Sequence, residues 1–211
     1  MDSFVAWLST TAFGIGPISA SRAELIGSVL GVWMVMCNIR VNPLAWPLAI
    51  ASSALYLLVF SQARLYGDAG LQVLFIVVAL WGWWQWLRGH QADGSALKVR
   101  YLSKRGQLAA LAAFGVLCPA TGLFLRHATD TDVPWWDAFP TAGSVIGQWL
   151  LGRKYVENWP AWIAVNVVGV ALFAYKGLWL TVGLYGLFLV MAAGGWVAWH
   201  RLAAANLARP H

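Results

Sequence analysis

The sequence predicts an all-α protein that crosses a membrane seven times, and three observations lead to this prediction. Of the 211 residues, 60% are hydrophobic and only 10% are charged, whereas soluble domains carry about 25% charged residues. The apolar residues form runs of about the 20 residues that are needed to cross a hydrocarbon core of roughly 30 Å. Lys and Arg are concentrated in the connections between these runs. Most of the surface must therefore face lipid.

Residues 1–22 precede the first run and are interpreted as a short interfacial segment. They are apolar and end in small residues, but Asp2 stands where a secretory signal has basic residues, and Gly14, Gly16 and Pro17 interrupt the stretch. We therefore do not expect a cleaved signal peptide.

The remaining chain is divided by its apolar runs. The predicted spans are Glu24–Ile39, Ala45–Gln62, Gly70–Leu87, Gly106–Leu125, Ala138–Gly152, Trp159–Tyr175 and Leu178–Trp199. These spans give a first three-helix repeat (23–88), a basic cytoplasmic loop (89–105), a linking helix (106–126), a second three-helix repeat (137–200) and a cytoplasmic tail (201–211).

The distribution of cations predicts the orientation, because cytoplasmic connections are enriched in Lys and Arg. With the N-terminus outside and the C-terminus inside, the cytoplasmic connections hold Arg40, Arg88, Lys98, Arg100, Lys104, Arg105, Arg153, Lys154, Arg201 and Arg209. The outer connections then hold only Arg22, Arg64, Arg126 and Lys176. The same distribution explains the net charge of +6 without a nucleic-acid partner.

Two segments of the chain resemble each other, which predicts an internal duplication. Gly-Ser-Val-Leu-Gly-Val-Trp at 27–33 matches Gly-Ser-Val-Ile-Gly-Gln-Trp at 143–149, a separation of 116 that also pairs Asn42 with Asn158 and Trp46 with Trp162. The string at 82–86 matches the string at 195–199 after a slip of three positions. We therefore predict two parallel three-helix repeats joined by one helix, an arrangement of transporters with a substrate site at the repeat interface.

The string Gly-Arg-Lys-Tyr-Val-Glu-Asn-Trp at 152–159, followed by Trp162 and Asn166, resembles the signature of the PnuC family of bacterial vitamin transporters. Leu-Tyr-Gly-Asp at 65–68 with Gln72 and Gly82-Trp83, and Trp-Trp-Asp at 135–137, resemble it as well. The resemblance covers residues 23–200 apart from the loop after Arg88.

This resemblance implies a fold related to the SWEET sugar transporters, a homotrimer and a place in the bacterial inner membrane. It also implies facilitated diffusion of nicotinamide riboside, with a cytosolic kinase that traps the vitamin by phosphorylation. Relatives of this family carry thiamine, riboflavin or deoxynucleosides, and these substrates are the alternatives.

Polar side chains within the spans are candidates for substrate contact, because an unpaired polar group is unfavourable in hydrocarbon. We predict that the carboxamides of Gln72, Gln148 and Asn166, with the hydroxyl of Ser52, bind the ribose and the amide of the base. Hydrogen bonds between helices are the structural alternative.

Aromatic residues are candidates for stacking on a cationic ring, by a cation–π attraction of roughly 2 kcal/mol when desolvated. We predict Trp46, Trp162 and Trp196 for this role, with Tyr56 and Tyr185 as weaker candidates. Packing or gating is the alternative.

Three residues near the inner ends of the spans are candidates for a gate, namely Trp83, Lys154 and Glu157. For Lys154 and Glu157 a surface ion pair is the alternative. At the outer end of the fifth span, Asp137 is expected to cap a helix rather than to steer a cation.

The sequence argues against an enzyme and against coupled transport. All eight acidic residues lie in termini, connections or span ends, so we expect no intramembrane carboxylate to relay protons or bind sodium. There is no Walker A string, and the histidines are scattered outside the predicted spans, so no cofactor and no metal are expected. A membrane-embedded enzyme and a structural membrane protein remain as alternative classes.

Overall fold

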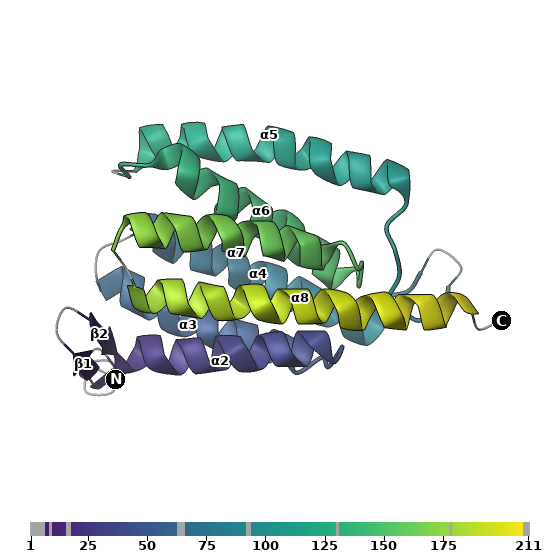
Figure 1. Cartoon of the computed structure of the whole chain (residues 1–211), viewed down its shortest axis with the longest axis horizontal. Coiled ribbons are helices and arrows are strands. Elements are labelled where there is room, and N and C mark those ends of the chain that lie inside the picture. Colours follow the sequence, from purple (N-terminus) through teal and green to yellow (C-terminus); the bar gives the residue numbers. More distant parts are fainter. Residues whose placement is uncertain are drawn as a thin grey trace. The chain divides into compact units, whose positions relative to one another are not determined.

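A computed structural model describes residues 7–8, 10–15, 18–62, 66–91, 94–129, 131–177 and 179–208. Its elements are two strands, β1 (Thr11–Ile15) and β2 (Ile18–Ser21), and the helices α2 (Arg22–Ile39), α3 (Ala45–Gln62), α4 (Tyr66–Arg88), α5 (Lys104–Ala128), α6 (Pro134–Gly152), α7 (Asn158–Tyr175) and α8 (Trp179–Ala208) (Figure 1). The predicted all-α fold with seven helices is confirmed.

Five of these helices are long and apolar enough to cross a membrane: Arg22–Ile39, Ala69–Arg88, Lys104–Ala128, Asn158–Tyr175 and Trp179–Ala208. Within the described residues, α3 contributes a shorter apolar helix, Ala45–Val59. The helix α6 has 19 residues, one more than α7, but carries Asp137, Ser144 and Gln148, and it is not in this group.

The helix bounds differ from the predicted spans mainly at the ends. The helix α8 continues to Ala208 instead of ending at Trp199, because its last residues are mostly alanine and leucine, which favour helix outside lipid as well. The segment before the first span contains an antiparallel hairpin of β1 and β2, which the apolar pattern of the sequence did not predict. Ser21 then caps α2 through a capping box with Glu24.

The chain forms two compact units, Met1–Trp83 and Trp84–His211, and each is described by itself. In the first unit, α2 packs against α3. The ring of Tyr56 lies where a Cβ on Gly27 would be only 2.9 Å away, and the ring of Trp46 lies over Gly82 on α4. Glycine is therefore what lets each large ring reach the neighbouring helix.

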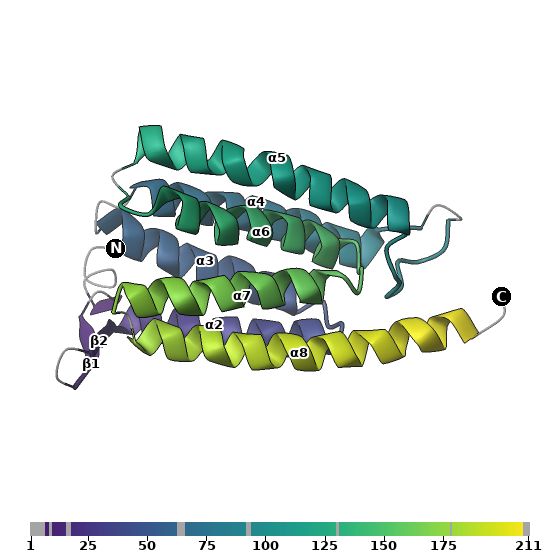
Figure 2. The ribbon, with the colours of Figure 1, turned by 45° about the horizontal axis from the view of Figure 1, so that its top comes forward.

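In the second unit, α5, α6, α7 and α8 pack in the order of the sequence, and they lie side by side in that order in Figures 1 and 2. Close contacts again occur at glycine. Trp135 lies over Gly122, Val165 lies against Gly143, and Trp159 lies over Gly195.

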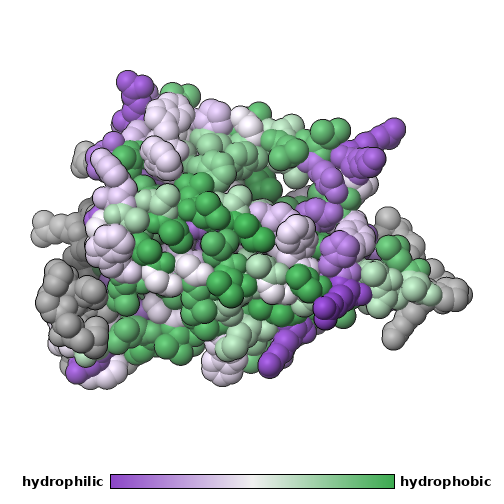
Figure 3. All heavy atoms as spheres, in the orientation of Figure 1, coloured by the Kyte–Doolittle hydropathy of each residue, from purple (hydrophilic) through white to green (hydrophobic). Residues whose placement is uncertain are grey.

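The surfaces of the helices are apolar away from their ends. On α5, Leu108, Leu111 and Val116 are largely exposed, and Gly122 is the one buried residue that the structure describes for this helix. Figure 3 shows hydrophobic residues along α7 and α8, with hydrophilic residues gathered near the helix ends. Lipid is the medium in which such a surface is stable.

The turn between α2 and α3 has the same backbone structure as the turn between α6 and α7. Val41 and Lys154 both have a positive φ, 53° and 56°. The amide after each donates to a helix carbonyl five residues back, Asn42 to Cys37 over 2.8 Å and Tyr155 to Leu150 over 2.9 Å. Local structure therefore repeats along the chain.

This repetition has a register of 113 positions, the separation of Val41 and Lys154. The starts of α3 and α7, and the starts of α4 and α8, are separated by the same number. Trp46 therefore corresponds to Trp159, and both rings lie over equivalent glycines, Gly82 and Gly195. The predicted pairing of Trp46 with Trp162 at a separation of 116 is wrong, because Trp159 and not Trp162 lies over the equivalent glycine. The two separations differ by only three residues, less than one helical turn, so tryptophans and glycines that are close together in the sequence could be matched in either register.

Candidate functional site

Two buried carboxamides mark the candidate substrate site in the second unit. Asn166 on α7 is 5% exposed and Gln148 on α6 is 8% exposed. Neither side chain has a hydrogen-bond partner within the part of the chain that the structure describes. The amide atoms of Gln148 and Asn166 are not among the fully buried polar atoms that lack a partner in the described structure, so these amides remain accessible to a polar ligand.

The packing of α6 on α7 positions these carboxamides. Gly143 and Gly147 bring α6 against Val165 and Trp162 on α7. Gln148 and Asn166 directly follow Gly147 and Val165 in the sequence, and both are buried on these two packed helices. The buried hydroxyl of Ser144 lies one helical turn from Gln148 on α6.

The predicted polar residues of the first unit mostly have structural partners. Ser52 donates to the carbonyl of Gly27 over 3.0 Å. The hydroxyl of Tyr56 lies 3.2 Å from that of Ser28 and also approaches the carbonyl of Glu24 at 3.5 Å. Gln72 is half-buried on α4, with no hydrogen-bond partner among the described residues. Of this group, Gln72 is the side chain that stays available.

The predicted aromatic residues differ in how accessible they are. Trp46 is only 1% exposed and packs on Gly82, so a ligand could stack on it only after the helices moved. Trp162 is half-buried against Gly147, and Trp196 is 43% exposed. Tyr185 packs against Gly169 and Phe173, with ring centroids 4.8 Å apart for the two aromatic side chains.

The connection between α4 and α5, here called the strap (89–91 and 94–103), lies against the α6–α7 turn and α8. Three of its own residues, Leu97, Val99 and Leu102, are buried. Its backbone pairs with the turn, since Arg100 donates to the carbonyl of Lys154 over 3.1 Å and accepts from the amide of Val156 over 3.0 Å. The strap is therefore a packed element rather than a free basic loop.

Lys154 is held by the strap and by α4. Its ammonium donates to the carbonyl of Leu97 over 3.0 Å and lies 5.1 Å from the centre of the Trp86 ring. Burial lowers the pKa of Lys154 below its ordinary value, because the charged form is less well solvated. Within the described residues it has no carboxylate partner.

Glu157 accepts from the amide of Leu102 over 2.9 Å and from the side chain of Gln107 over 3.1 Å. The alternative of a surface ion pair between Lys154 and Glu157 is therefore wrong, because the strap supplies a separate partner to each. Their role in gating stays a prediction, as does that of Trp83, which is half-buried near the end of α4.

A tryptophan cluster lies beside the strap. Trp86 donates to the carbonyl of Leu151 over 3.1 Å and lies 6.1 Å from Trp199 between ring centroids. Trp199 is fully buried and meets Trp159 edge to face at 5.6 Å. All three rings are buried, so the cluster is part of the packed interior of the second unit.

Replacing Glu157 with alanine is expected to destabilise the protein by about 1–3 kcal/mol, because the buried amide of Leu102 loses its acceptor. Thermal unfolding in detergent measures this loss. Glu157→Gln is the matched control, since its remaining carbonyl oxygen can still accept from Leu102 and should preserve most of the stability. Equal losses in both variants would show that the charge matters instead of the hydrogen bond.

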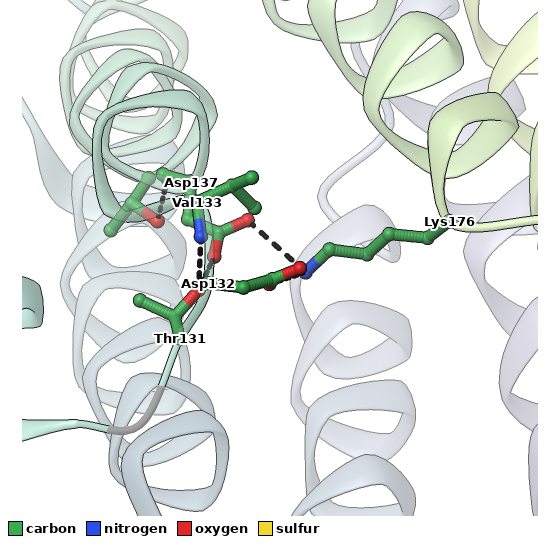
Figure 4. Close-up of polar contacts among 6 residues, drawn as sticks. Thr131, Asp132, Val133, Asp137 and Lys176 are labelled. Atoms are coloured by element: carbon green, nitrogen blue, oxygen red, sulfur yellow. Dashed lines mark hydrogen bonds and ion pairs between the residues drawn. The ribbon is translucent and has the colours of Figure 1, made fainter.

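At the opposite end of α6, a second polar group joins α6 to α7 (Figure 4). Lys176 lies 3.7 Å from Asp137 and 3.9 Å from Asp132, and Thr131 donates to Asp137. The expected capping role of Asp137 is wrong. The cap residue is Val133, which makes no side-chain capping bond, and Asp137 lies within the first turn of α6. A carboxylate is still favourable there because of the helix dipole.

Comparison with known proteins places this geometry in context. The family described as nicotinamide mononucleotide transporter matches residues 21–201. The riboflavin/roseoflavin transporter RibM of Streptomyces davaonensis is 31% identical over 199 residues, covering 90% of this chain and 91% of that protein. The nicotinamide riboside transporter PnuC of Escherichia coli is 25% identical over 210 residues, covering 88% of each.

One solved structure shares the fold. The crystal structure of the vitamin B3 transporter PnuC aligns with a TM-score of 0.70 at 24% identity, over 87% of this chain and 82% of that one. At this level of identity the likeness concerns the arrangement of the helices.

Proposed function

Because the chain belongs to the PnuC family of vitamin transporters of the bacterial inner membrane, we propose that it carries nicotinamide riboside into the cell by facilitated diffusion. A cytosolic kinase then keeps the vitamin inside by phosphorylating it. The chain itself is a transporter and not an enzyme.

The observation that carries this proposal is the pair of buried carboxamides, Gln148 and Asn166, without partners in the described structure. A carboxamide can donate and accept at once, which suits both ribose hydroxyls and the amide of the base. The half-buried ring of Trp162 near Gly147 adds an aromatic surface for a pyridinium.

The positions of the carboxylates support an uncoupled mechanism. Glu24, Asp132, Asp137 and Glu157 lie at helix ends or in connections of the described structure. Proton- or sodium-coupled carriers often use acidic residues within the membrane. We propose that the concentration gradient of the vitamin drives its transport.

Riboflavin is the second candidate, and the 31% identity with RibM favours it. Its ribityl hydroxyls and the imide edge of its ring would also suit carboxamides. Its ring is uncharged, so cation–π attraction would contribute nothing to its binding.

Uptake by proteoliposomes of purified protein tests these substrates. Labelled nicotinamide riboside, riboflavin and thiamine are supplied separately, with and without a proton ionophore. Saturable uptake of nicotinamide riboside that stops at equal concentrations and ignores the ionophore is expected. Uptake of riboflavin alone would replace the substrate and keep the mechanism, and accumulation above the outside concentration would overturn the mechanism.

We further propose an outside N-terminus, parallel three-helix repeats and a homotrimer. The cation distribution supports the orientation, and the local repetition at 113 positions supports the repeats. The trimer rests on the family resemblance. Labelling of Ala204→Cys by an impermeant thiol reagent should require permeabilised cells, and native mass spectrometry should give three copies.

A further inference from the structure

A cavity of about 320 Å³ lies between the start of α6 and the end of α7. It is lined by Val133, Trp136, Ala171, Leu172 and Tyr175. Leu172 is buried, whereas Trp136 and Tyr175 are exposed. Two aromatic rings thus border an apolar cavity whose volume is at the lower end of the roughly 300–1,000 Å³ range of ligand pockets.

The charges beside this cavity are unbalanced. Asp132, Asp137 and Lys176 are sequence neighbours of the lining residues Val133, Trp136 and Tyr175. Lys176 lies between the two carboxylates, and both distances, 3.7 and 3.9 Å, are long for an ion pair (Figure 4). One ammonium cannot neutralise two carboxylates, and the Asp132 side chain is 72% exposed. The border of the cavity therefore keeps a negative charge.

We propose that this cavity is a docking site for a flat aromatic cation on its way to the carboxamides Gln148 and Asn166. Trp136 and Tyr175 offer ring faces that attract a cation, and the surplus carboxylate attracts it over a longer range. The ligand class is a pyridinium, so this inference rests on the proposed transport of nicotinamide riboside. With the N-terminus outside, the cavity opens on the outer side.

Charge complementarity distinguishes this occupant from a lipid chain. Binding of an acyl chain would depend on the shape of the apolar cavity alone. Binding of a pyridinium would be favoured by the negative charge of Asp132 and opposed by the positive charge of Lys176. Removing a carboxylate should weaken docking, and removing the ammonium should strengthen it.

The test measures the KM for uptake of nicotinamide riboside by proteoliposomes. Asp132→Asn and Trp136→Leu are each expected to raise the KM about three- to tenfold, with the maximal rate unchanged. Lys176→Met is expected to lower it. Higher ionic strength should raise the KM of the unmodified protein more than that of Asp132→Asn, because salt screens exposed charges.

Trp135→Leu is the matched control for Trp136→Leu. Trp135 is the preceding residue and is exposed to a similar extent, but its ring packs over Gly122 and does not line the cavity. Its replacement should leave the KM unchanged. Equal effects of the two replacements would overturn the docking site.

Binding of 1-methylnicotinamide, a pyridinium without ribose, separates this inference from the proposed function. Calorimetric titration should show binding to the unmodified protein and weaker binding to Asp132→Asn. Unchanged binding in that variant would overturn the docking site even if nicotinamide riboside is carried. Absence of nicotinamide riboside uptake, with charge-dependent binding of the probe, would overturn the proposed substrate alone.

Discussion

Replacing Asn166 with leucine is expected to lower kcat/KM for vitamin uptake by about tenfold or more. Leucine has a similar volume and suits the apolar interior of α7, so the fold should persist. The variant loses a buried carboxamide that has no partner among the described residues. A hydrogen bond from such a group to a ligand is worth about 1–3 kcal/mol, and 1.4 kcal/mol corresponds to tenfold.

Initial rates of uptake by proteoliposomes, at equal amounts of reconstituted protein, measure this effect. Ser52→Ala serves as the control, because the Ser52 hydroxyl already donates to the carbonyl of Gly27 and should not be needed by the substrate. If Asn166→Leu transports normally and Ser52→Ala does not, the substrate site lies in the first unit instead.

Replacing Gly195 with alanine is expected to destabilise the second unit by about 1–3 kcal/mol. A Cβ at this position would lie 2.5 Å from the Trp159 ring, which is closer than such atoms approach. The ring cannot move aside easily, because it is buried and meets the fully buried Trp199 edge to face. Gly82→Ala should act in the same way on Trp46 in the first unit.

Gly194→Ala is the matched control for Gly195→Ala. Nothing lies within 4 Å of a Cβ at Gly194, and it occupies the same helix one residue earlier. Alanine there should be neutral or stabilising, since it favours helix over glycine. Thermal unfolding in detergent compares the two, and a similar loss in both would show that helix flexibility, not contact with Trp159, requires the glycine.

The sequence was a good guide to the helices, since apolar runs have sharp ends where polar turns begin. The predicted end of the first span at Ile39 and both bounds of the second span agree with α2 and α3. The hairpin before α2 was not foreseen, because its strands are only five and four residues long and only the second, Ile-Ser-Ala-Ser, alternates apolar and polar residues. The extension of α8 was missed because a hydropathy criterion stops where lipid would end.

The candidate site was only partly predictable. Carboxamides within apolar runs are visible in the sequence, and Gln148 and Asn166 are indeed buried. The partners of Lys154 and Glu157 could not be foreseen, because they are a backbone carbonyl and an amide of the strap. Any residue type can supply such groups, so composition carries no signal for them.

The shared register of 113 positions shows which residues of the two halves correspond and where the halves differ. The turns at Val41 and Lys154 keep one backbone shape although their side chains differ, as expected if the predicted duplication was followed by divergence of the two copies. At the same separation, Ser53 corresponds in sequence to Asn166, and Tyr56 corresponds to Gly169. The counterpart of the buried carboxamide of Asn166 is therefore the hydroxyl of Ser53, so the substrate contact proposed for Asn166 has no equivalent amide in the first unit.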